Sequence, residues 1–346
     1  LSGKQYEKYT VLRKGDFAYN KGNSKKYPQG CVYRLKDRDS AAVPNVFECF
    51  RIKEGNKNYI EQVFISGFLN RQLSKKINHG VRDDGLLNLT GEDFYKSYII
   101  IPPLPEQEKI AEILQTQDKV IELQQKKIDE LKRLKKGYLS KMFPKKGCNV
   151  PEIRFPGFTD AWEQRKLGEI GSVSMCRRIF KEQTSETGDI PFYKIGTFGA
   201  EPDAFISREL FEEYKSKYPY PKKGDILISA SGSIGRTVEF AGNNEYFQDS
   251  NIVWLSHDER LSNSFLKCFY SVVKWAGIEG STIKRLYNDN ILNTVICMPS
   301  VPEQEHIGLF FENLDNLITL HQRKCDEEKQ KKKALMQLLL TGIVRT

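Results

Sequence analysis

A long internal repeat constrains this chain more than any other feature of its sequence. The stretch PPLPEQEKI at 102–110 returns as PSVPEQEHI at 299–307, an offset of 197 residues. The match continues without a gap, and 16 of the 38 positions aligned between 102–139 and 299–336 are identical. Charged helices can resemble one another by composition, but a gapless match of this length indicates two diverged copies of one unit.

The repeat also extends upstream of these stretches. Phe68-Leu69 aligns with Phe265-Leu266 at the same offset, whereas Lys14-Gly15-Asp16 aligns with Lys223-Gly224-Asp225 only at an offset of 209. Each copy is therefore expected to be a globular domain followed by a long helix, giving the segments 1–104, 105–144, 145–301 and 302–346. Leu1 is not an initiator methionine, and the alignment predicts about 60 further residues ahead of a complete first copy.

The two repeated stretches are predicted to begin long helices. Proline and glutamate at their starts are N-terminal helix signals, and apolar residues follow at coiled-coil spacing. About 37 residues would form a rod of about 55 Å, and two such helices could return antiparallel. Gln117 and Gln124 fall in the seam, where they either fix the register or lie in a hydrated part of the interface. The expected apolar seam consists of Ile110, Leu114, Ile121, Ile128, Leu131, Tyr138 and Met142 in the first helix, and Ile307, Phe311, Leu314, Ile318, Cys325, Leu335 and Leu339 in the second.

A second apolar stripe makes this helical face wider than a two-stranded seam needs. We interpret it as a candidate surface for binding another protein. Its members are Ile113, Val120, Leu123, Leu134, Phe310, Leu317 and Leu320.

The globular halves alternate short apolar runs with turns, which predicts mixed α/β (α+β) domains. The expected fold is thus two copies of such a domain, separated and joined by two long antiparallel coiled-coil helices with a pseudo-two-fold repeat. In the first copy we expect strands at Cys31–Leu35, Val46–Ile52 and Tyr98–Ile101 and a helix at Tyr59–Ile77. In the second we expect strands at Phe192–Ile195, Asp225–Ser229, Arg236–Phe240, Asn251–Ser256 and Thr294–Met298 and a helix at Ser262–Ala276.

Four polar stretches combine cations with small hydroxyl residues, glycine or an aromatic ring. Such stretches suit contact with nucleic-acid phosphates and bases, although the glycine-rich loop at 229–236 can equally be a tight strand connection and the lysines plain solvated side chains. The candidates are Lys21, Ser24, Lys25, Lys26 and Tyr27, then Arg177, Arg178 and Lys181, then Ser231, Ser233 and Arg236, and finally Ser281, Thr282, Lys284 and Arg285.

Several kinds of chemistry have no support in the sequence. It contains no G-x-x-x-x-G-K-[ST] phosphate loop, no H-E-x-x-H metal motif and no catalytic constellation. Its seven cysteines include no C-x-x-C pair, which argues against a zinc site and a disulfide framework and favours reduced thiols. No apolar run is long enough to span a membrane. We therefore expect no catalytic residue, no metal, no cofactor and no membrane in this chain.

With these pieces assembled, the chain resembles the specificity (S) subunits of type I restriction–modification enzymes, the HsdS family. The likeness is carried by PPLPEQE at 102–108, PSVPEQE at 299–305, and PEIRFPGFTDAW at 151–162 followed by Lys166-Leu167-Gly168. The last block opens a recognition domain in that family and occurs once here, before the second domain. The first domain would accordingly be truncated at its N-terminus.

The resemblance implies a function without catalysis. An S subunit reads a bipartite DNA target through two recognition domains, and its helices set the spacing of the two half-sites. Two methyltransferase (M) subunits bind the helices and methylate adenine with S-adenosylmethionine, and restriction (R) subunits that use ATP and Mg²⁺ join for cleavage. The implied setting is the bacterial cytoplasm, on double-stranded DNA and in host defence. The alternatives are an enzyme in its own right and a scaffold that binds only proteins.

The net charge is uneven along the repeat. The chain carries a formal charge of +9. Residues 1–104 hold 18 basic and 11 acidic residues and 105–144 hold 9 and 7, whereas the remaining segments are balanced. Charge therefore supports nucleic-acid binding for the first half only, and the second half depends on the repeat and the resemblance.

Overall fold

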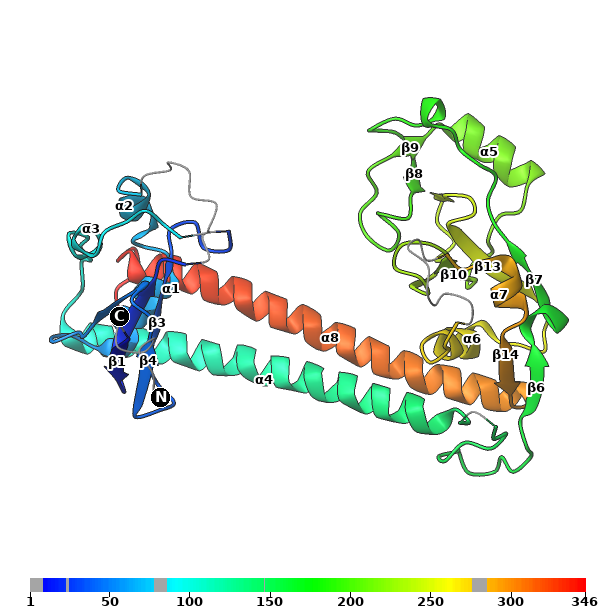
Figure 1. Cartoon of the computed structure of the whole chain (residues 1–346), viewed down its shortest axis with the longest axis horizontal. Helices are drawn as coiled ribbons and strands as arrows, with labels where there is room; N and C mark the ends of the chain where they lie inside the picture. The colour runs from blue at the N-terminus through cyan, green and yellow to red at the C-terminus, as the bar shows by residue number, and fades with distance from the viewer. Residues whose placement is uncertain (1–8, 23–24, 78–85, 146, 276–284) are drawn as a thin grey trace. The chain divides into compact units, whose positions relative to one another are not determined.

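The computed structural model describes residues 9–22, 25–77, 86–145, 147–275 and 285–346. The chain divides into two compact units, and each long helix contributes to both. Unit 1 comprises Leu1–Ile128 with Leu320–Thr346, and unit 2 comprises Asp129–Thr319. The two long helices are α4 (Leu104–Met142) and α8 (Val301–Leu340), drawn in cyan to green and in orange to red (Figure 1).

Unit 1 places a small helix between a sheet and the long helices. Strands β3, β2 and β5 form an antiparallel sheet in that order, and β1 pairs with β4. The core unites Tyr59 and Ile60 of α1 with Ile110 and Leu114 of α4 and Leu339 of α8. The elements are β1 (Thr10–Arg13), β2 (Phe17–Asn20), β3 (Cys31–Arg34), β4 (Ser40–Val43), β5 (Phe47–Phe50), α1 (Lys57–Ile65), α2 (Asn70–Ser74) and α3 (Gly91–Tyr95).

Unit 2 has the same plan with more strands. One sheet has the order β11-β10-β13-β7, a second β12-β8-β9, and β14 pairs with β6. Phe265 and Phe269 of α6 pack with Ile307 and Phe311 of α8 and Met142 of α4. The elements are β6 (Glu163–Lys166), η2 (Leu167–Glu169), β7 (Gly171–Ser174), η3 (Lys181–Gln183), β8 (Ile190–Tyr193), β9 (Phe205–Ile206), α5 (Arg208–Lys217), β10 (Ile226–Ser229), β11 (Thr237–Glu239), β12 (Tyr246–Phe247), β13 (Ile252–His257), α6 (Asn263–Tyr270), α7 (Asn288–Leu292) and β14 (Val295–Met298).

The Lys-Gly-Asp repeat forms the same turn in each unit. The carboxylate of Asp16 accepts from the Arg13 N–H at 2.9 Å, and that of Asp225 accepts from the Lys222 N–H at 2.7 Å. The intervening glycines have φ of +90° and +92°, a conformation that a side chain would strain. In unit 1 the Arg51 guanidinium hydrogen-bonds Asp16 and lowers its pKa to about 2. The repeat thus extends into local geometry.

A buried glutamine joins each domain to its long helix. The Oε1 atom of Gln304 accepts from the backbone N–H of Ser262, the N-cap of α6, at 2.8 Å. Its Nε2 atom donates to the carbonyls of Arg260 and Pro299 at 2.9 and 3.0 Å. Gln107 repeats this arrangement in unit 1, with the N-cap residue of α1 and the carbonyl of Pro102 as its partners. We call these arrangements the glutamine clamps.

The helix pair is antiparallel, and equivalent residues of the two copies make equivalent polar contacts. The Lys332 ammonium pairs with Asp118 at 2.6 Å in unit 1, and the equivalent Lys135 pairs with Asp315 at 2.6 Å in unit 2. The predicted apolar seam is largely confirmed: Ile110, Leu114, Ile128, Leu131, Met142, Ile307, Phe311, Leu314, Cys325 and Leu339 are all buried.

Both seam glutamines have polar partners on the opposite helix. Gln117 donates to the carboxylate of Glu328, and Gln124 hydrogen-bonds the ring of His321 at 2.8 Å. These direct side-chain contacts favour the register-fixing interpretation over a merely hydrated seam.

Three secondary-structure predictions were wrong. Tyr98–Ile101 is irregular, although its repeat counterpart is β14. The helix predicted at 59–77 is divided into α1 and α2 by Gly67, whose φ is +73°. The helix predicted at 262–276 ends at Tyr270.

The upstream alignment also needs correction. Asn56 and Ser262 are the N-caps of α1 and α6 and bind the equivalent clamp glutamines. They align at an offset of 206, so Phe68 is not the counterpart of Phe265; Tyr59 is.

The clamp predicts a specific loss of stability. Replacing Gln304 by alanine leaves the part-buried Ser262 N–H and Arg260 carbonyl and the buried Pro299 carbonyl without this partner, and we expect it to lower the unfolding free energy of unit 2 by about 2 kcal/mol. Urea unfolding followed by tryptophan fluorescence measures unit 2 selectively, because Trp162, Trp254 and Trp275 all lie there. The exposed Asn313→Ala on the unit 2 part of the same helix is the control, and equal effects of the two substitutions would contradict the clamp.

Candidate nucleic-acid interface

Three loops of unit 2 bring two arginines and a serine together around a single turn, residues 249–251. The Arg178 guanidinium pairs with the Asp249 carboxylate at 2.9 Å. The Arg285 guanidinium donates to the Ser250 carbonyl at 3.0 Å, and the Ser231 hydroxyl lies 2.8 Å from the side-chain oxygen of Asn251. We call this group the 249–251 cluster.

The cluster combines exposed cations with an aromatic ring and an open pocket. Arg178 is 60% exposed at its side chain despite its ion pair. The guanidinium of Arg285 lies 6.0 Å from the ring centroid of the exposed Tyr287. Ser250, Arg285 and Tyr287 line the pocket together with Met175. Guanidinium groups and aromatic rings are the side chains that contact phosphates and bases in nucleic-acid complexes.

Ser250, in the middle of this turn, has a left-handed backbone conformation. Its φ is +52°, the only positive value of a non-glycine residue among those that the structure describes. A β-carbon in this region costs about 1–2 kcal/mol, and such strain concentrates at functional sites. The turn is held by backbone bonds, because the Asn251 N–H donates to the Asp249 carbonyl at 2.6 Å.

The other unit 2 candidates are engaged differently. Arg236 donates to the Ile195 carbonyl at 2.9 Å and lies over the Phe198 ring, so its guanidinium already has protein partners. The carbonyl of Ser233 accepts from the Ser229 hydroxyl, which makes the 229–236 loop a tight connection between β10 and β11. Arg177 lies over the Tyr218 ring, and Lys181 begins η3, so the cluster around 249–251 does not contain them.

Only some of the candidate DNA-contact residues of unit 1 are exposed and free of ion pairs among the described residues. Lys21 pairs with Glu48 at 2.6 Å and its side chain is 15% exposed, so it cannot act as a free cation. Lys25 and Lys26 are exposed, and the Lys26 ammonium lies 5.3 Å from the centroid of the Tyr27 ring. Four predicted contact residues lie outside the described part of the chain: Ser24, Ser281, Thr282 and Lys284.

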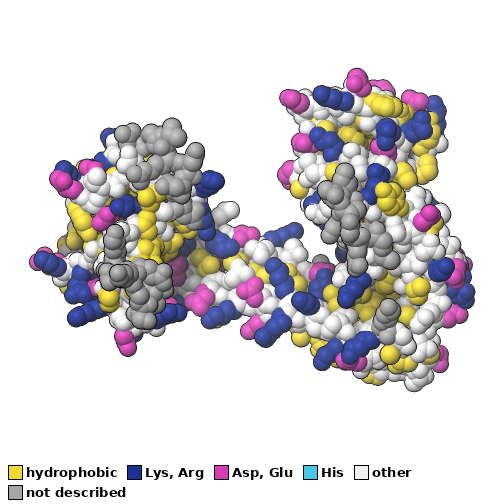
Figure 2. Space-filling view, viewed as in Figure 1, with side chains coloured by type: hydrophobic (Ala, Val, Ile, Leu, Met, Phe, Trp, Pro, Cys, Tyr) yellow, Lys and Arg dark blue, Asp and Glu magenta, His cyan; other side chains and the backbone are white. Residues whose placement is uncertain are grey.

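The predicted protein-binding stripe is mostly exposed. Leu123 is 64% and Leu320 46% exposed in unit 1, and both directly precede the residues of the Gln124–His321 hydrogen bond. Ile113, Leu134 and Leu317 are also exposed, whereas Val120 is half-buried. Figure 2 shows apolar atoms between the charged side chains of the helices on the face drawn.

Phe310 is the exception in this stripe. It is half-buried and packs edge-on against Tyr138 and Phe155, with centroids 5.2 and 5.8 Å apart, so it belongs to the unit 2 core. Leu309, one residue earlier, is 57% exposed, and the sequence pattern missed it.

The described residues also bear on functions other than DNA binding. Among the described residues no group of three or more histidine, cysteine or acidic side chains is placed to hold a metal ion. Over the same residues, no helix is long and apolar enough to cross a membrane. All seven cysteines are free thiols, and burial raises the pKa of Cys176, which precedes the Arg177–Arg178 pair, to about 12.

Comparison with known proteins identifies the family. The family model of the type I restriction modification DNA specificity domain matches residues 4–133 and 159–329, most of the chain. The chain belongs to this family. The family is named for the DNA specificity domain of type I restriction modification systems.

Individual relatives agree with this assignment. A Haemophilus influenzae protein assigned as a type I restriction enzyme specificity subunit is 58% identical over 171 residues, 48% of this chain and 44% of that protein. The MjaVIII specificity subunit of Methanocaldococcus jannaschii is 26% identical over 289 residues, 75% of this chain and 65% of that protein. The chain thus spans less than two thirds of either curated relative.

Solved structures support the fold. The crystal structure of a type I restriction–modification S subunit from M. genitalium matches with a TM-score of 0.59 at 16% identity, covering 96% of this chain and 84% of that one. A chain from a study of type I R-M complex assembly and conformational transition matches with a TM-score of 0.57 at 18% identity and the same coverage. The two-copy mixed α/β fold predicted from the repeat is therefore confirmed.

The strain at Ser250 is testable. Ser250→Gly removes the β-carbon at a positive φ while keeping the carbonyl that Arg285 binds, so we expect the unfolding free energy of unit 2 to rise by about 0.5–1 kcal/mol. Ser233→Gly, whose φ is not positive, should instead lower it slightly. Tryptophan fluorescence in urea measures both, and a loss of stability in Ser250→Gly would refute the assignment of strain.

Proposed function

We propose that this chain is the DNA-specificity subunit of a type I restriction–modification enzyme, in which each recognition domain reads one half of a bipartite double-stranded target. The observation that carries the proposal is the 249–251 cluster: three separate loops of a family recognition domain place Arg178, Arg285 and Ser231 beside a strained turn. An arginine that binds a base edge with two hydrogen bonds discriminates between bases by about 1–3 kcal/mol.

Unit 2 also supplies the polar atoms that reading requires. Asn251, Ser231 and Tyr287 lie beside the two arginines and add amide, hydroxyl and phenol groups to the surface. The unit carries no net charge excess of its own. Its contribution to binding is therefore expected to be short-ranged and dependent on sequence, rather than general attraction to phosphate.

Unit 1 is expected to contribute more of the general attraction. Most of the chain's positive excess lies in residues 1–104, and the exposed Lys25 and Lys26 are its candidate phosphate contacts. Two domains that address one face of a duplex would read half-sites about 34 Å apart, one helical turn.

The exposed helix stripe is the proposed docking surface for two methyltransferase (M) subunits. Leucines such as Leu123 and Leu320 are more exposed than a seam requires, which favours burial against a partner. S-adenosylmethionine would bind those subunits and support adenine methylation, and restriction (R) subunits with ATP and Mg²⁺ would join for cleavage. This chain itself would hold no cofactor, and its work on cellular DNA would take place in the bacterial cytoplasm.

DNA binding tests the cluster. Methylation-aware sequencing of cells that carry the system defines the target, and fluorescence anisotropy then measures binding of that duplex to the chain assembled with its methyltransferase subunit. Arg178→Ala and Arg285→Ala are each expected to weaken binding of the target duplex by about tenfold. Asp249→Asn, which removes a negative charge from the same surface but keeps a side-chain oxygen that can hold Arg178 in place, should not weaken it.

Arg165→Ala is the matched control, because this arginine of unit 2 pairs with Glu163 and Glu169 away from the cluster. A cluster variant that loses affinity equally for target and random duplexes would have lost a phosphate contact instead of base reading. Equal binding of both duplexes by the unmodified assembly would overturn the proposal, and no footprint on DNA at all would favour the protein-only scaffold.

The docking stripe is tested separately. Leu123→Asp combined with Leu320→Asp places two charges on an exposed apolar surface, which should leave folding intact but abolish co-purification of the methyltransferase subunit. Ile343→Asp, at an equally exposed apolar residue beyond α8, is the control. Retention of the partner by the double variant would place its binding site elsewhere.

A further inference from the structure

Two cysteines of unit 2 that are far apart in the sequence lie close together. The Sγ atom of Cys297, on β14, is 3.9 Å from the carbonyl oxygen of Cys148, in the connection between α4 and β6. That oxygen is two bonds from the Cα of Cys148, which places the Cys297 sulfur within about 6.5 Å of this Cα. Because disulfides join residues whose Cα atoms are about 4.4–6.8 Å apart, rotation of the Cys148 side chain with a small backbone shift brings the two sulfur atoms into bonding distance.

Cys297 faces a surface cavity from its strand. Successive side chains of a strand point to opposite faces, and its neighbours Ile296 and Met298 are both buried in the unit 2 core. Cys297 lies between them and is only half-buried. The strand is paired in register with β6, where Gln164 lies opposite this cysteine.

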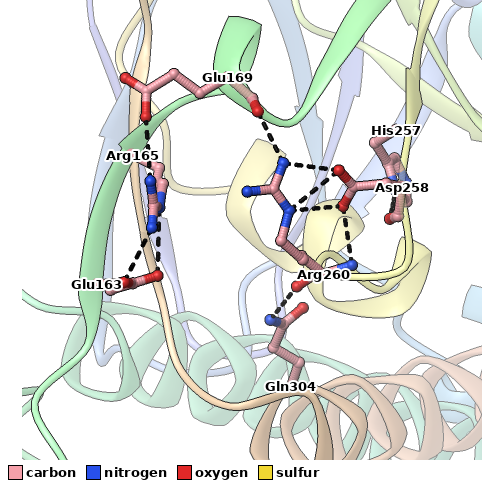
Figure 3. Close-up of polar contacts among 7 residues, drawn as sticks. All are labelled: Glu163, Arg165, Glu169, His257, Asp258, Arg260 and Gln304. Atoms are coloured by element: carbon pink, nitrogen blue, oxygen red, sulfur yellow. Dashed lines mark hydrogen bonds and ion pairs between the residues drawn. The ribbon is translucent and has the colours of Figure 1, made fainter.

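Polar contacts hold β6, the partner of this strand, in place (Figure 3). Arg165 pairs with the carboxylates of Glu163 and Glu169 at 3.1 and 3.7 Å. The Arg260 guanidinium donates to the Glu169 carbonyl at 2.8 Å, and the Arg260 carbonyl accepts from the clamp residue Gln304. Since β6 and β14 are tied in this way to the start of α8, the movement that joins the two sulfur atoms must come from the other cysteine.

Cys148 lies in a short exposed turn that follows α4. Its N–H donates to the Lys145 carbonyl at 2.9 Å, and the next residue, Asn149, accepts from the Trp162 N–H at 2.8 Å. These bonds hold the turn against the domain and leave the Cys148 side chain exposed. Its thiol is therefore accessible to small molecules and can rotate toward Cys297.

Both cysteines line one open cavity of about 1260 Å³. Pockets that bury drug-sized ligands measure roughly 300–1,000 Å³, so a molecule the size of a small peptide can enter this one. Its described lining residues include Lys136, Lys145 and Lys274 but no aspartate or glutamate. The cavity should therefore attract small anions.

The surroundings assign different roles to the two thiols. Lys145 pairs with Glu152, and its pKa is raised mainly by that hydrogen bond and to a smaller extent by the nearby Cys148 sulfur. A cation beside a thiol stabilises the thiolate, which is the nucleophile in disulfide exchange. Burial instead raises the pKa of the Cys297 thiol. Cys148 is therefore suited to attack an oxidant, and Cys297 to complete the bond.

The other five cysteines are not arranged for such a bond. Cys176, Cys268 and Cys325 are buried. Cys31 and Cys49 lie on β3 and β5, which flank β2 on opposite sides, so two strand spacings of about 4.8 Å each separate them. This distance exceeds the usual Cα separation of a disulfide.

We propose that Cys148 and Cys297 form a reversible disulfide on reaction with a low-molecular-weight disulfide such as oxidised glutathione. The Cys148 thiolate attacks one sulfur of the oxidant, bonds to it and releases the other half as a thiolate. Cys297 then gives up its proton and attacks the Cys148 sulfur, which releases the second half. Two protein thiols are oxidised to one disulfide, and the oxidant is reduced to two thiols that take up the two protons.

The new bond joins the exit of α4 to the strand that leads into α8. It closes a loop from residue 148 to residue 297 that contains most of the unit 2 domain, and such cross-links stabilise mainly by restricting the unfolded chain. Reducing thiol pools keep the pair open, so the bond forms only under oxidising conditions. The inference concerns redox control of the stability of unit 2 and does not depend on DNA reading.

Peptide mapping and unfolding of the full chain test the pair. After incubation with oxidised glutathione, mass spectrometry without reductant should find Cys148 and Cys297 in one cross-linked peptide. The urea midpoint of unit 2, followed by tryptophan fluorescence, should rise by about 1 M and return to its starting value with dithiothreitol. Unreacted thiols, glutathione on single cysteines without this cross-link, or an unchanged midpoint in the cross-linked chain would overturn the proposal.

Matched variants make the test specific. Cys297→Ser should stop the reaction at the mixed disulfide between Cys148 and glutathione, whereas Cys31→Ser, at a half-buried cysteine of unit 1, should leave the cross-link intact. Lys145→Ala should slow formation of the mixed disulfide several-fold, and Lys217→Ala, which removes another exposed lysine paired with a glutamate, should not. A cross-link between Cys148 and another cysteine in Cys297→Ser, or equal rates in the two lysine variants, would refute the assigned roles.

Discussion

The glutamine clamps are the interaction on which the rest of the structure depends. Each long helix begins where a domain ends, so buried backbone groups of both must be satisfied at one point. Gln304 meets this need by accepting from the N-cap of α6 and donating to two carbonyls, with no exposure to solvent. Gln107 accepts from the N-cap of α1 in the same way and donates to one carbonyl, that of Pro102. Because leaving such groups unpaired costs about 1–3 kcal/mol each, the clamp fixes the entry of each helix against its domain and orients the loops that the domain carries.

The repeat is preserved in charge but not in every packing position. The pairs Asp118–Lys332 and Lys135–Asp315 exchange places under the repeat, and Gln124 hydrogen-bonds its own counterpart, His321. Elsewhere the copies differ. Leu131 and Leu314 lie in the apolar core of unit 2, whereas their counterparts in unit 1 are Glu328 and Gln117, which hydrogen-bond each other. A polar pair at one position of an otherwise apolar seam is a device for specifying register. The asymmetry therefore distinguishes the native pairing from alternatives in which either helix pairs with itself.

Sequence reasoning succeeded where structure is local and failed where it depends on partners. The long helices were predictable because their periodicity and N-terminal signals lie within the helix itself. Tyr98–Ile101 has the composition of a strand, yet only Val295–Met298 forms one, because β6 is there to pair with it. The arginines of the 249–251 cluster were found by charge, but Asp249 and Tyr287 were not, since only folding brings their loops together. The positive φ of Ser250 has no sequence signal, because glycine is the residue expected there.

The charge distribution assigns different electrostatic roles to the two domains. In unit 2, Arg178 is already paired with Asp249, so DNA that binds it must replace this carboxylate with a phosphate or a base acceptor. Because the pair has no net charge, it adds no long-range attraction to DNA. Beyond a Debye length of about 8 Å, the electrostatic field of such a pair is screened and attracts DNA very little. Its benefit is orientation, because the guanidinium is held in place before contact and a poorly matched base does not repay the exchange of partners. Unit 1 carries the excess charge, although pairing with Glu48 removes Lys21 from it. A protein that divides its charge in this way would use one domain mainly for attraction and the other mainly for discrimination, so salt should weaken the contribution of unit 1 more than that of unit 2.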